Sequence, residues 1–180
     1  MVVCPGDIHE PSQRTKLDSV GKALASSDSF LHRFTPPGAA FSSVFEILAV
    51  HSAPRVEVTV FDFPEVFRHY DEVAGYDYWK IYVDDMSYHE GHGKFYETFG
   101  ISEKGCIIVI RPDQYVSYVG PMEDVEAVNK FFSGFMRAPK GGSSDLVSGG
   151  ITNGAVASGP GTNGTGNGEV LADEAAALPM

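Results

Sequence analysis

Residues 100–120, GISEKGCIIVIRPDQYVSYVG, decide the fold of this 180-residue chain. Two apolar runs, CIIVI at 106–110 and YVSYVG at 115–120, flank the short polar segment RPDQ at 111–114. Apolar runs on both sides of a tight polar turn predict an antiparallel β-hairpin. Because Cys106 opens the first run, the sequence raises the question of whether the hairpin carries a thiol catalyst or belongs to a scaffold.

The hairpin is followed by the segment PMEDVEAVNKFFSGFM at 121–136, which has the pattern of an amphipathic helix. Pro121 suits the first position of a helix, and the acidic Glu123 and Asp124 suit its first turn. One stripe of the predicted helix is apolar and comprises Met122, Val125, Val128, Phe132 and Phe135.

Upstream of the hairpin, strand-like and helix-like segments alternate. MVVC at 1–4 reads as a strand that ends at Pro5 and Gly6, and PSQRTKLDSVGKALASS at 11–27 reads as a helix with Ser12 as its N-cap. Further strands are predicted within 43–53, 55–63 and 78–85, and residues 86–100 read as a loop and a short helix closed by Gly100. This order predicts one α/β domain over residues 1–137.

The composition changes sharply after this domain. Residues 138–180 are dominated by Gly, Ser, Asn and Thr and contain no aromatic side chain. A segment so poor in large apolar groups does not repay the entropy lost on ordering, so the sequence predicts a disordered tail.

The charge balance limits the classes of partner. With 24 acidic and 13 basic residues the formal net charge is -11, which repels phosphate backbones and anionic lipid. No apolar run approaches the roughly 20 residues that span a bilayer, and the first residues lack the pattern of a secretory signal. We therefore expect a cytoplasmic protein that binds neither nucleic acid nor membrane.

The chain has two cysteines, Cys4 and Cys106, far apart in the sequence. They form neither a CxxC motif nor a zinc-binding spacing, and buried, reduced thiols are the simpler interpretation. The hairpin and its following helix resemble the second half of the thioredoxin fold. A working thioredoxin carries a thiol pair after its first central strand, where this chain has CPGDI at 4–8, and a cis-proline before the hairpin, where it has Gly105 and Cys106. No catalytic residue is therefore predicted.

A more specific resemblance covers nearly all of residues 1–137. The stretches at 33–58, 82–101 and 111–136 resemble the C-terminal thioredoxin-like domain of FAD-dependent phenol hydroxylases and related aromatic-ring monooxygenases. The resemblance implies a fold without the thioredoxin cysteines and a role in dimer assembly, with FAD and NADPH bound only by a partner or a full-length relative. The chain itself has no GxGxxG between a strand and a helix, because its glycine-dense segment at 159–168 lies in the tail.

Two departures from the family pattern suggest a truncated or stand-alone copy. Met1 falls within the first predicted strand, and the hairpin turn has Asp113 and Gln114 where the family often has Asp-Gly.

Two groups of residues are candidate sites. Aromatic residues are concentrated within 76–82, and such clusters are typical of protein cores and interfaces. Our candidate contact surface comprises Tyr76, Tyr78, Trp79 and Tyr82. The motif HEGHG supplies His89 and His92, but two histidines in a glycine-containing loop are too few for tetrahedral zinc, so no metal site is predicted. Asp84 and Asp85 are expected to serve in capping or turn formation rather than as an acid/base pair.

Two functions remain open from the sequence. The first is a non-catalytic assembly domain that forms a homodimer or docks on a flavin-dependent monooxygenase, as an accessory to such an enzyme or a fragment of one. The alternative is a small-molecule tailoring protein that binds an aromatic ligand in a cleft near Tyr88, His89 and His92.

Overall fold

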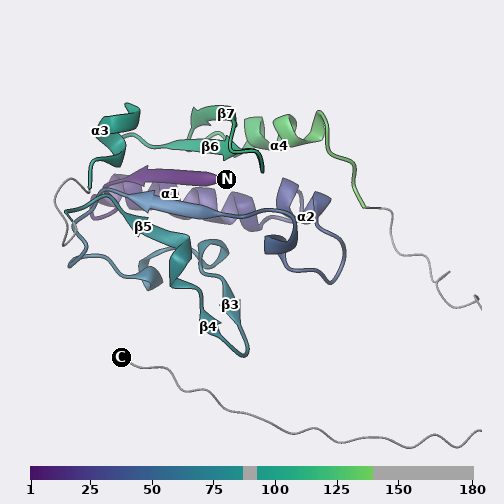
Figure 1. Cartoon of the computed structure of the whole chain (residues 1–180), viewed down its shortest axis with the longest axis horizontal. Helices are drawn as coiled ribbons and strands as arrows, with labels where there is room; N and C mark the ends of the chain where they lie inside the picture. The colour runs from purple at the N-terminus through teal and green to yellow at the C-terminus, as the bar shows by residue number, and fades with distance from the viewer. Residues whose placement is uncertain (87–92, 140–180) are drawn as a thin grey trace, which may run out of the picture. The chain divides into compact units, whose positions relative to one another are not determined.

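A computed structural model describes residues 1–86 and 93–139 of the chain (Figure 1). Five strands form a mixed sheet in the order β5-β2-β1-β6-β7, and a separate two-stranded hairpin pairs β3 with β4. The strands are β1 (Val2–Gly6), β2 (Leu48–His51), β3 (Tyr70–Asp71), β4 (Gly75–Tyr76), β5 (Ile81–Val83), β6 (Cys106–Ile110) and β7 (Val116–Pro121). The helices are α1 (Pro11–Ala25), α2 (Phe30–Phe34), α3 (Phe95–Phe99) and α4 (Val125–Ser133). The prediction of an α/β architecture is confirmed.

The strand β1 lies at the centre of the sheet. It runs parallel to β2 and antiparallel to β6, and β5 extends the parallel side while β7 extends the antiparallel side. The strand ends at Gly6, whose φ of 73° lies in the left-handed region. A Cβ atom there would collide with the carbonyl oxygen of Glu103, so this close approach requires glycine.

The predicted hairpin is present as β6 and β7. Its turn is closed by the Arg111 amide, which donates to the Tyr115 carbonyl at 2.9 Å, and Gln114 adopts a left-handed φ of 69°. A glycine fits that conformation without strain, which explains why an Asp-Gly turn suits this hairpin. Arg111 pairs with Asp113 at 2.7 Å, but both side chains are exposed and the pair contributes little to stability.

Two apolar clusters lie on the sheet, because successive residues of β1 point to opposite faces. Val3 belongs to the main core, which α1, α2 and α4 cover with side chains that include Leu17, Leu24 and Phe30. Val2 and Cys4 belong to a smaller cluster, to which Tyr96 of α3 contributes. The side chain of Asn129 in α4 accepts a hydrogen bond from the Phe30 amide at 2.7 Å and ties α2 to α4.

Both predicted helix starts were wrong by a few residues. The helix α1 begins at Pro11, with Glu10 at the N-cap position and Ser12 inside the first turn, because proline fixes φ and lacks the amide that a cap would satisfy. Pro121 ends β7 opposite Cys106, and α4 starts only after Asp124, whose carboxylate accepts from the Ala127 amide at 3.0 Å. Phe135 lies beyond α4 and is exposed, whereas the predicted Val125, Val128 and Phe132 are buried.

The strand predicted over 55–63 is absent from this described part of the chain. Residues 55–59 form a turn and an irregular segment, and Val60–Asp62 form a single 3-10 turn, with a capping box between Thr59 and Asp62. The β-branched pattern there does not mark a buried face, because Val56 is 88% exposed and the neighbouring edge of β2 is occupied by β5. The other two strands are shorter than predicted, since β2 covers only Leu48–His51 and β5 only Ile81–Val83.

Candidate functional site

Aromatic side chains gather at the β3–β4 hairpin and the segments beside it. Phe61 packs edge to face on Tyr76 with ring centroids 5.3 Å apart, and Tyr70 packs on the same Tyr76 at 5.0 Å. Tyr78 and Trp79 follow directly, with 64% and 77% of their surface exposed. We call these five residues, Phe61, Tyr70, Tyr76, Tyr78 and Trp79, the aromatic surface.

Three of the four predicted contact residues, Tyr76, Tyr78 and Trp79, lie on the aromatic surface. The fourth, Tyr82, is 43% exposed on β5, and among the described residues it joins no aromatic pair. Sequence reasoning missed Phe61 and Tyr70. Tyr70 is the register partner of Tyr76 in the β3–β4 hairpin, so the short turn between them was the signal that could have found it.

Acidic side chains fix the backbone beneath the aromatic surface. Asp71 accepts from the amides of Val73 and Ala74 at 2.8 Å and thereby shapes the β3–β4 turn, and Asp77 accepts from the Trp79 amide at 2.9 Å. These backbone hydrogen bonds lower the pKa of both carboxyl groups below their usual values. These hydrogen bonds therefore hold the backbone of the aromatic surface in a defined conformation.

Lys80 anchors the same segment to the body of the domain. Its ammonium group pairs with Glu46 and lies 3.3 Å from Asp77, and only 17% of its side chain is exposed. The hydrogen bond to Glu46 raises the pKa of Lys80, so the ammonium group of Lys80 remains charged across the neutral range. Arg68 adds a cation–π contact to Phe61, with its guanidinium carbon 5.9 Å from the ring centroid.

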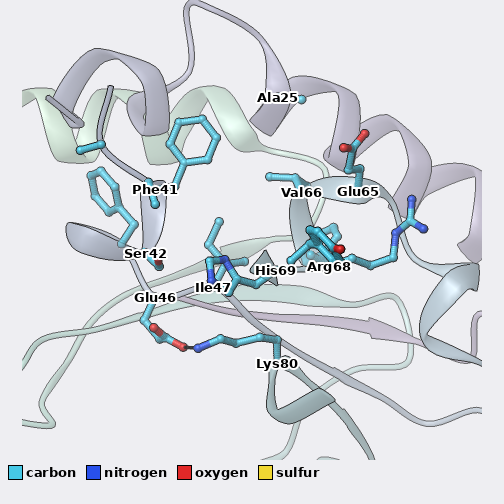
Figure 2. Close-up of a pocket in the computed structure, with 15 residues that line it drawn as sticks. Ala25, Phe41, Ser42, Glu46, Ile47, Glu65, Val66, Arg68, His69 and Lys80 are labelled. Carbon is cyan, nitrogen blue, oxygen red and sulfur yellow. Dashed lines mark hydrogen bonds and ion pairs between the residues drawn. The ribbon is translucent and has the colours of Figure 1, made fainter. Parts of the chain in front are cut away.

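Two hollows adjoin this region. One, of about 370 Å³, is lined by residues 74–79 together with His69 and Asp71, and so it opens directly beside Tyr78 and Trp79. The other, of about 570 Å³, lies between the end of α1, residues 39–47 and residues 65–70 (Figure 2). Figure 2 shows Glu46 and Lys80 meeting at its wall, opposite apolar side chains such as Phe41 and Val66. An ion pair and apolar walls suit the binding of a partner side chain better than acid/base chemistry.

The two cysteines, predicted as buried, reduced thiols from positions far apart in the sequence, are neighbours in the sheet. Cys4 of β1 and Cys106 of β6 are register partners, and Cys106 packs against the cluster that contains Cys4 and Tyr96. Cys4 is fully buried, whereas Cys106 is partly exposed. Their proximity depends on the pairing of β1 with β6, two strands about 100 residues apart in the sequence, which no local sequence pattern reports.

Tyr96 closes the cluster around the cysteines. Its hydroxyl accepts a hydrogen bond from the Gly6 amide at 2.8 Å and donates one to the Val50 carbonyl at 2.7 Å, so it bridges the ends of β1 and β2. Asp84 holds the start of α3 by accepting from the amides of Phe95 and Tyr96. The prediction that Asp84 acts in capping is confirmed, and Asp85 similarly accepts from the Arg55 amide at 3.1 Å.

Replacing Tyr96 with phenylalanine is expected to lower the free energy of unfolding by about 1–3 kcal/mol, because the Gly6 amide and the Val50 carbonyl lose their shared partner in a buried site. Chemical denaturation followed by circular dichroism measures the change. The matched control is Tyr115→Phe, which removes a hydroxyl from a tyrosine that is 72% exposed. Equal stability of the two variants would contradict the bridging role of Tyr96.

The predicted ligand cleft at Tyr88, His89 and His92 lies outside the described residues. Within residues 1–86 and 93–139, no group of three or more His, Cys, Asp or Glu side chains is arranged to hold a metal ion. No helix in that part of the chain is long and apolar enough to cross a membrane.

Comparison with known proteins identifies the family. The model of the phenol hydroxylase C-terminal dimerisation domain matches residues 1–140. The chain is 36% identical over 141 residues to the FAD-dependent monooxygenase terD of Aspergillus terreus and 35% identical over 141 residues to the phenol 2-monooxygenase fsqG of Aspergillus fumigatus. A 3-hydroxybenzoate 4-monooxygenase of Comamonas testosteroni is 34% identical over 110 residues, which is 60% of this chain and 17% of that protein.

The first two matches cover 76% and 78% of this chain but only 23% and 22% of the relatives. The shared part is thus the domain built around the sheet and the aromatic surface. The chain belongs to the family of phenol hydroxylase C-terminal dimerisation domains.

Proposed function

We propose that this chain is a non-catalytic, thioredoxin-like association module and that two copies dimerise through the aromatic surface. The observation that carries the proposal is the aromatic surface itself: four of its five residues, Phe61, Tyr70, Tyr78 and Trp79, are more than half exposed. A hollow of about 370 Å³ opens beside them. Aromatic side chains of this kind dominate the energetics of protein interfaces. The name of the family model, a dimerisation domain, supports the same role.

The topology supports the thioredoxin-like part of the proposal. A first strand lies between a parallel strand and an antiparallel one, and the chain then continues through β7 into a closing helix. The thiol pair of a redox-active thioredoxin belongs to a single CxxC motif that follows the first strand, whereas here the two cysteines lie within two different strands of the sheet and neither starts a helix. A role in association therefore fits this fold better than thioredoxin-type catalysis.

A second copy of the chain is the partner that fits the surface best. In a two-fold symmetric dimer each copy presents the same patch, so a protruding group must find a hollow in that same patch. Trp79 is 77% exposed and can supply such a group, and the adjoining hollow is lined by the same β3–β4 segment. Because the chain carries a net charge of -11, two copies repel over most of their surfaces, and the Arg68 guanidinium beside Phe61 lessens that repulsion locally.

The relatives named as FAD-dependent monooxygenases suggest an additional partner. A flavin-dependent monooxygenase with a domain of this family would present a similar surface, and we propose that this chain docks on it in the same way. We further propose that the chain itself binds neither FAD nor NADPH, because its sequence supplies no glycine-rich turn between a strand and a helix to receive a pyrophosphate.

Co-expression of two copies that carry different affinity tags tests self-association directly. We expect capture through one tag to recover the copy with the other tag as well, in about half the amount of the captured copy if equally expressed chains pair at random. The purified complex should show no visible flavin absorption after incubation with FAD and desalting. Capture of one tagged copy alone at high expression would contradict self-association. A yellow complex with one flavin per chain would contradict the non-catalytic assignment.

A further inference from the structure

Cys4 and Cys106 lie close enough to form a disulfide bond, and neither residue belongs to the aromatic surface through which dimerisation is proposed. Cys4 and Cys106 stand directly opposite each other on antiparallel strands, and directly opposite residues point to the same face of a sheet. Their Cα atoms in such a pair are about 4.5–5.5 Å apart, within the range of about 4.4–6.8 Å that a disulfide spans. Packing of Cys106 on the cluster that holds Cys4 confirms that the two side chains share one site.

The two thiols differ in their surroundings. Cys4 is fully buried, under Tyr96 and beside Val2, and Cys106 is partly open to solvent. The contact with Cys106 and burial raise the pKa of Cys4, while the hydrogen bond from Cys4 lowers the pKa of Cys106. Cys106, the more accessible of the two, therefore loses its proton first. Cys106 has the character of an attacking thiolate, and Cys4 beside it has that of a resolving thiol.

We propose that Cys4 and Cys106 form a redox-active dithiol, which a hydroperoxide oxidises to a cross-strand disulfide between β1 and β6. In the first step the Cys106 thiolate attacks the terminal oxygen of the hydroperoxide and the O–O bond breaks. The remaining alkoxide, or hydroxide in the case of hydrogen peroxide, takes up a proton and leaves, so that Cys106 becomes a sulfenic acid.

In the second step the sulfur of Cys4 gives up its proton and attacks the sulfur of Cys106. The new S–S bond displaces the hydroxyl group, which takes up that proton and leaves as water. In sum two thiols lose two electrons, and one hydroperoxide is reduced to an alcohol and one water molecule. An external dithiol reverses the change by exchange with the disulfide.

The disulfide would join β1, the central strand of the sheet, covalently to its neighbour β6. It joins Cys4 to Cys106, about 100 residues later in the chain, and a bridge that closes a long loop restricts the unfolded chain most. Oxidation is therefore expected to raise the thermal unfolding midpoint. The aromatic surface contains neither cysteine, so this inference stands or falls separately from the proposed dimerisation.

The test treats the full native chain with hydrogen peroxide, blocks the remaining thiols by alkylation and maps the peptides by mass spectrometry without reduction. We expect both free thiols to disappear, one linked peptide pair that contains Cys4 and Cys106 within a single chain, a higher unfolding midpoint, and recovery of both thiols with dithiothreitol. Two wild-type outcomes overturn the proposal: Cys106 oxidised to sulfinic acid while Cys4 stays free, or both thiols retained.

Single variants separate the roles of the two sulfurs. In Cys4→Ser, Cys106 should still be oxidised but should stop at sulfenic or sulfinic acid, and in Cys106→Ser the buried Cys4 should remain a free thiol. Circular dichroism checks that each variant is folded, and the wild-type measurement decides the question if one is not. Faster oxidation of Cys4 in Cys106→Ser than of Cys106 in Cys4→Ser would overturn the assigned order of attack.

Discussion

Replacing Phe30 with alanine is expected to lower the free energy of unfolding by about 3–5 kcal/mol. The Phe30 side chain is fully buried, stacks on Phe132 of α4 with centroids 4.5 Å apart, and meets Phe45 edge to face at 5.0 Å. Its removal opens a cavity where α2, α4 and the segment before β2 converge, and the rigid surroundings fill such a cavity only in part.

Denaturant titration followed by circular dichroism measures this loss. The matched control is Phe99→Ala in α3, since Phe99 is 69% exposed and its removal should change stability by at most about 0.5 kcal/mol. A smaller substitution, Phe30→Leu, should fall between the two. Comparable losses for Phe30→Ala and Phe99→Ala would show that the core is not centred on the aromatic stack described above.

The parts of the fold that the sequence predicts well are those whose signals are local. The hairpin of β6 and β7 follows from two apolar runs around a tight turn, and the short helix α3 ends at Gly100, which adopts the left-handed conformation typical of a helix C-terminus. Likewise, the spacing of Leu17, Val20 and Leu24 alone was enough to identify the buried face of α1.

The parts that it predicts poorly depend on tertiary structure. Residues 55–63 have the β-branched composition of a strand, but a strand needs a neighbouring strand to pair with. Both edges of β2 are already paired, one with β1 and the other with β5. Local capping also overrides strand propensity, since the Asp77 side chain holds residues 78–80 in a 3-10 turn just before β5. Propensity alone cannot weigh these competing interactions.

Some residues of the candidate site can be predicted from the local sequence, whereas others depend on tertiary structure. Tyr76, Tyr78 and Trp79 could be proposed from their density in the sequence, and Tyr78 and Trp79 are exposed as a contact role requires. Phe61 joins them only because the chain folds back on itself there. The register of Cys4 against Cys106 is a still longer-range property, because it depends on the pairing of the first strand with a strand about 100 residues later.

The most direct test of the central claim, dimerisation through the aromatic surface, is sedimentation velocity over a concentration series of wild type and Trp79→Ala. Trp79 is 77% exposed, so its removal should leave the monomer folded, as circular dichroism can verify. Truncating an aromatic anchor at an interface costs about 2 kcal/mol or more, which corresponds to about a 30-fold increase in Kd.

The matched control in this measurement is Tyr115→Ala, which removes a similarly exposed aromatic side chain at the β6–β7 turn. The account predicts a wild-type dimer, a Tyr115→Ala dimer of equal affinity, and a folded Trp79→Ala chain that is largely monomeric at the same concentrations. A wild-type chain that stays monomeric at the highest concentration, or a dimer weakened by Tyr115→Ala and not by Trp79→Ala, would contradict it.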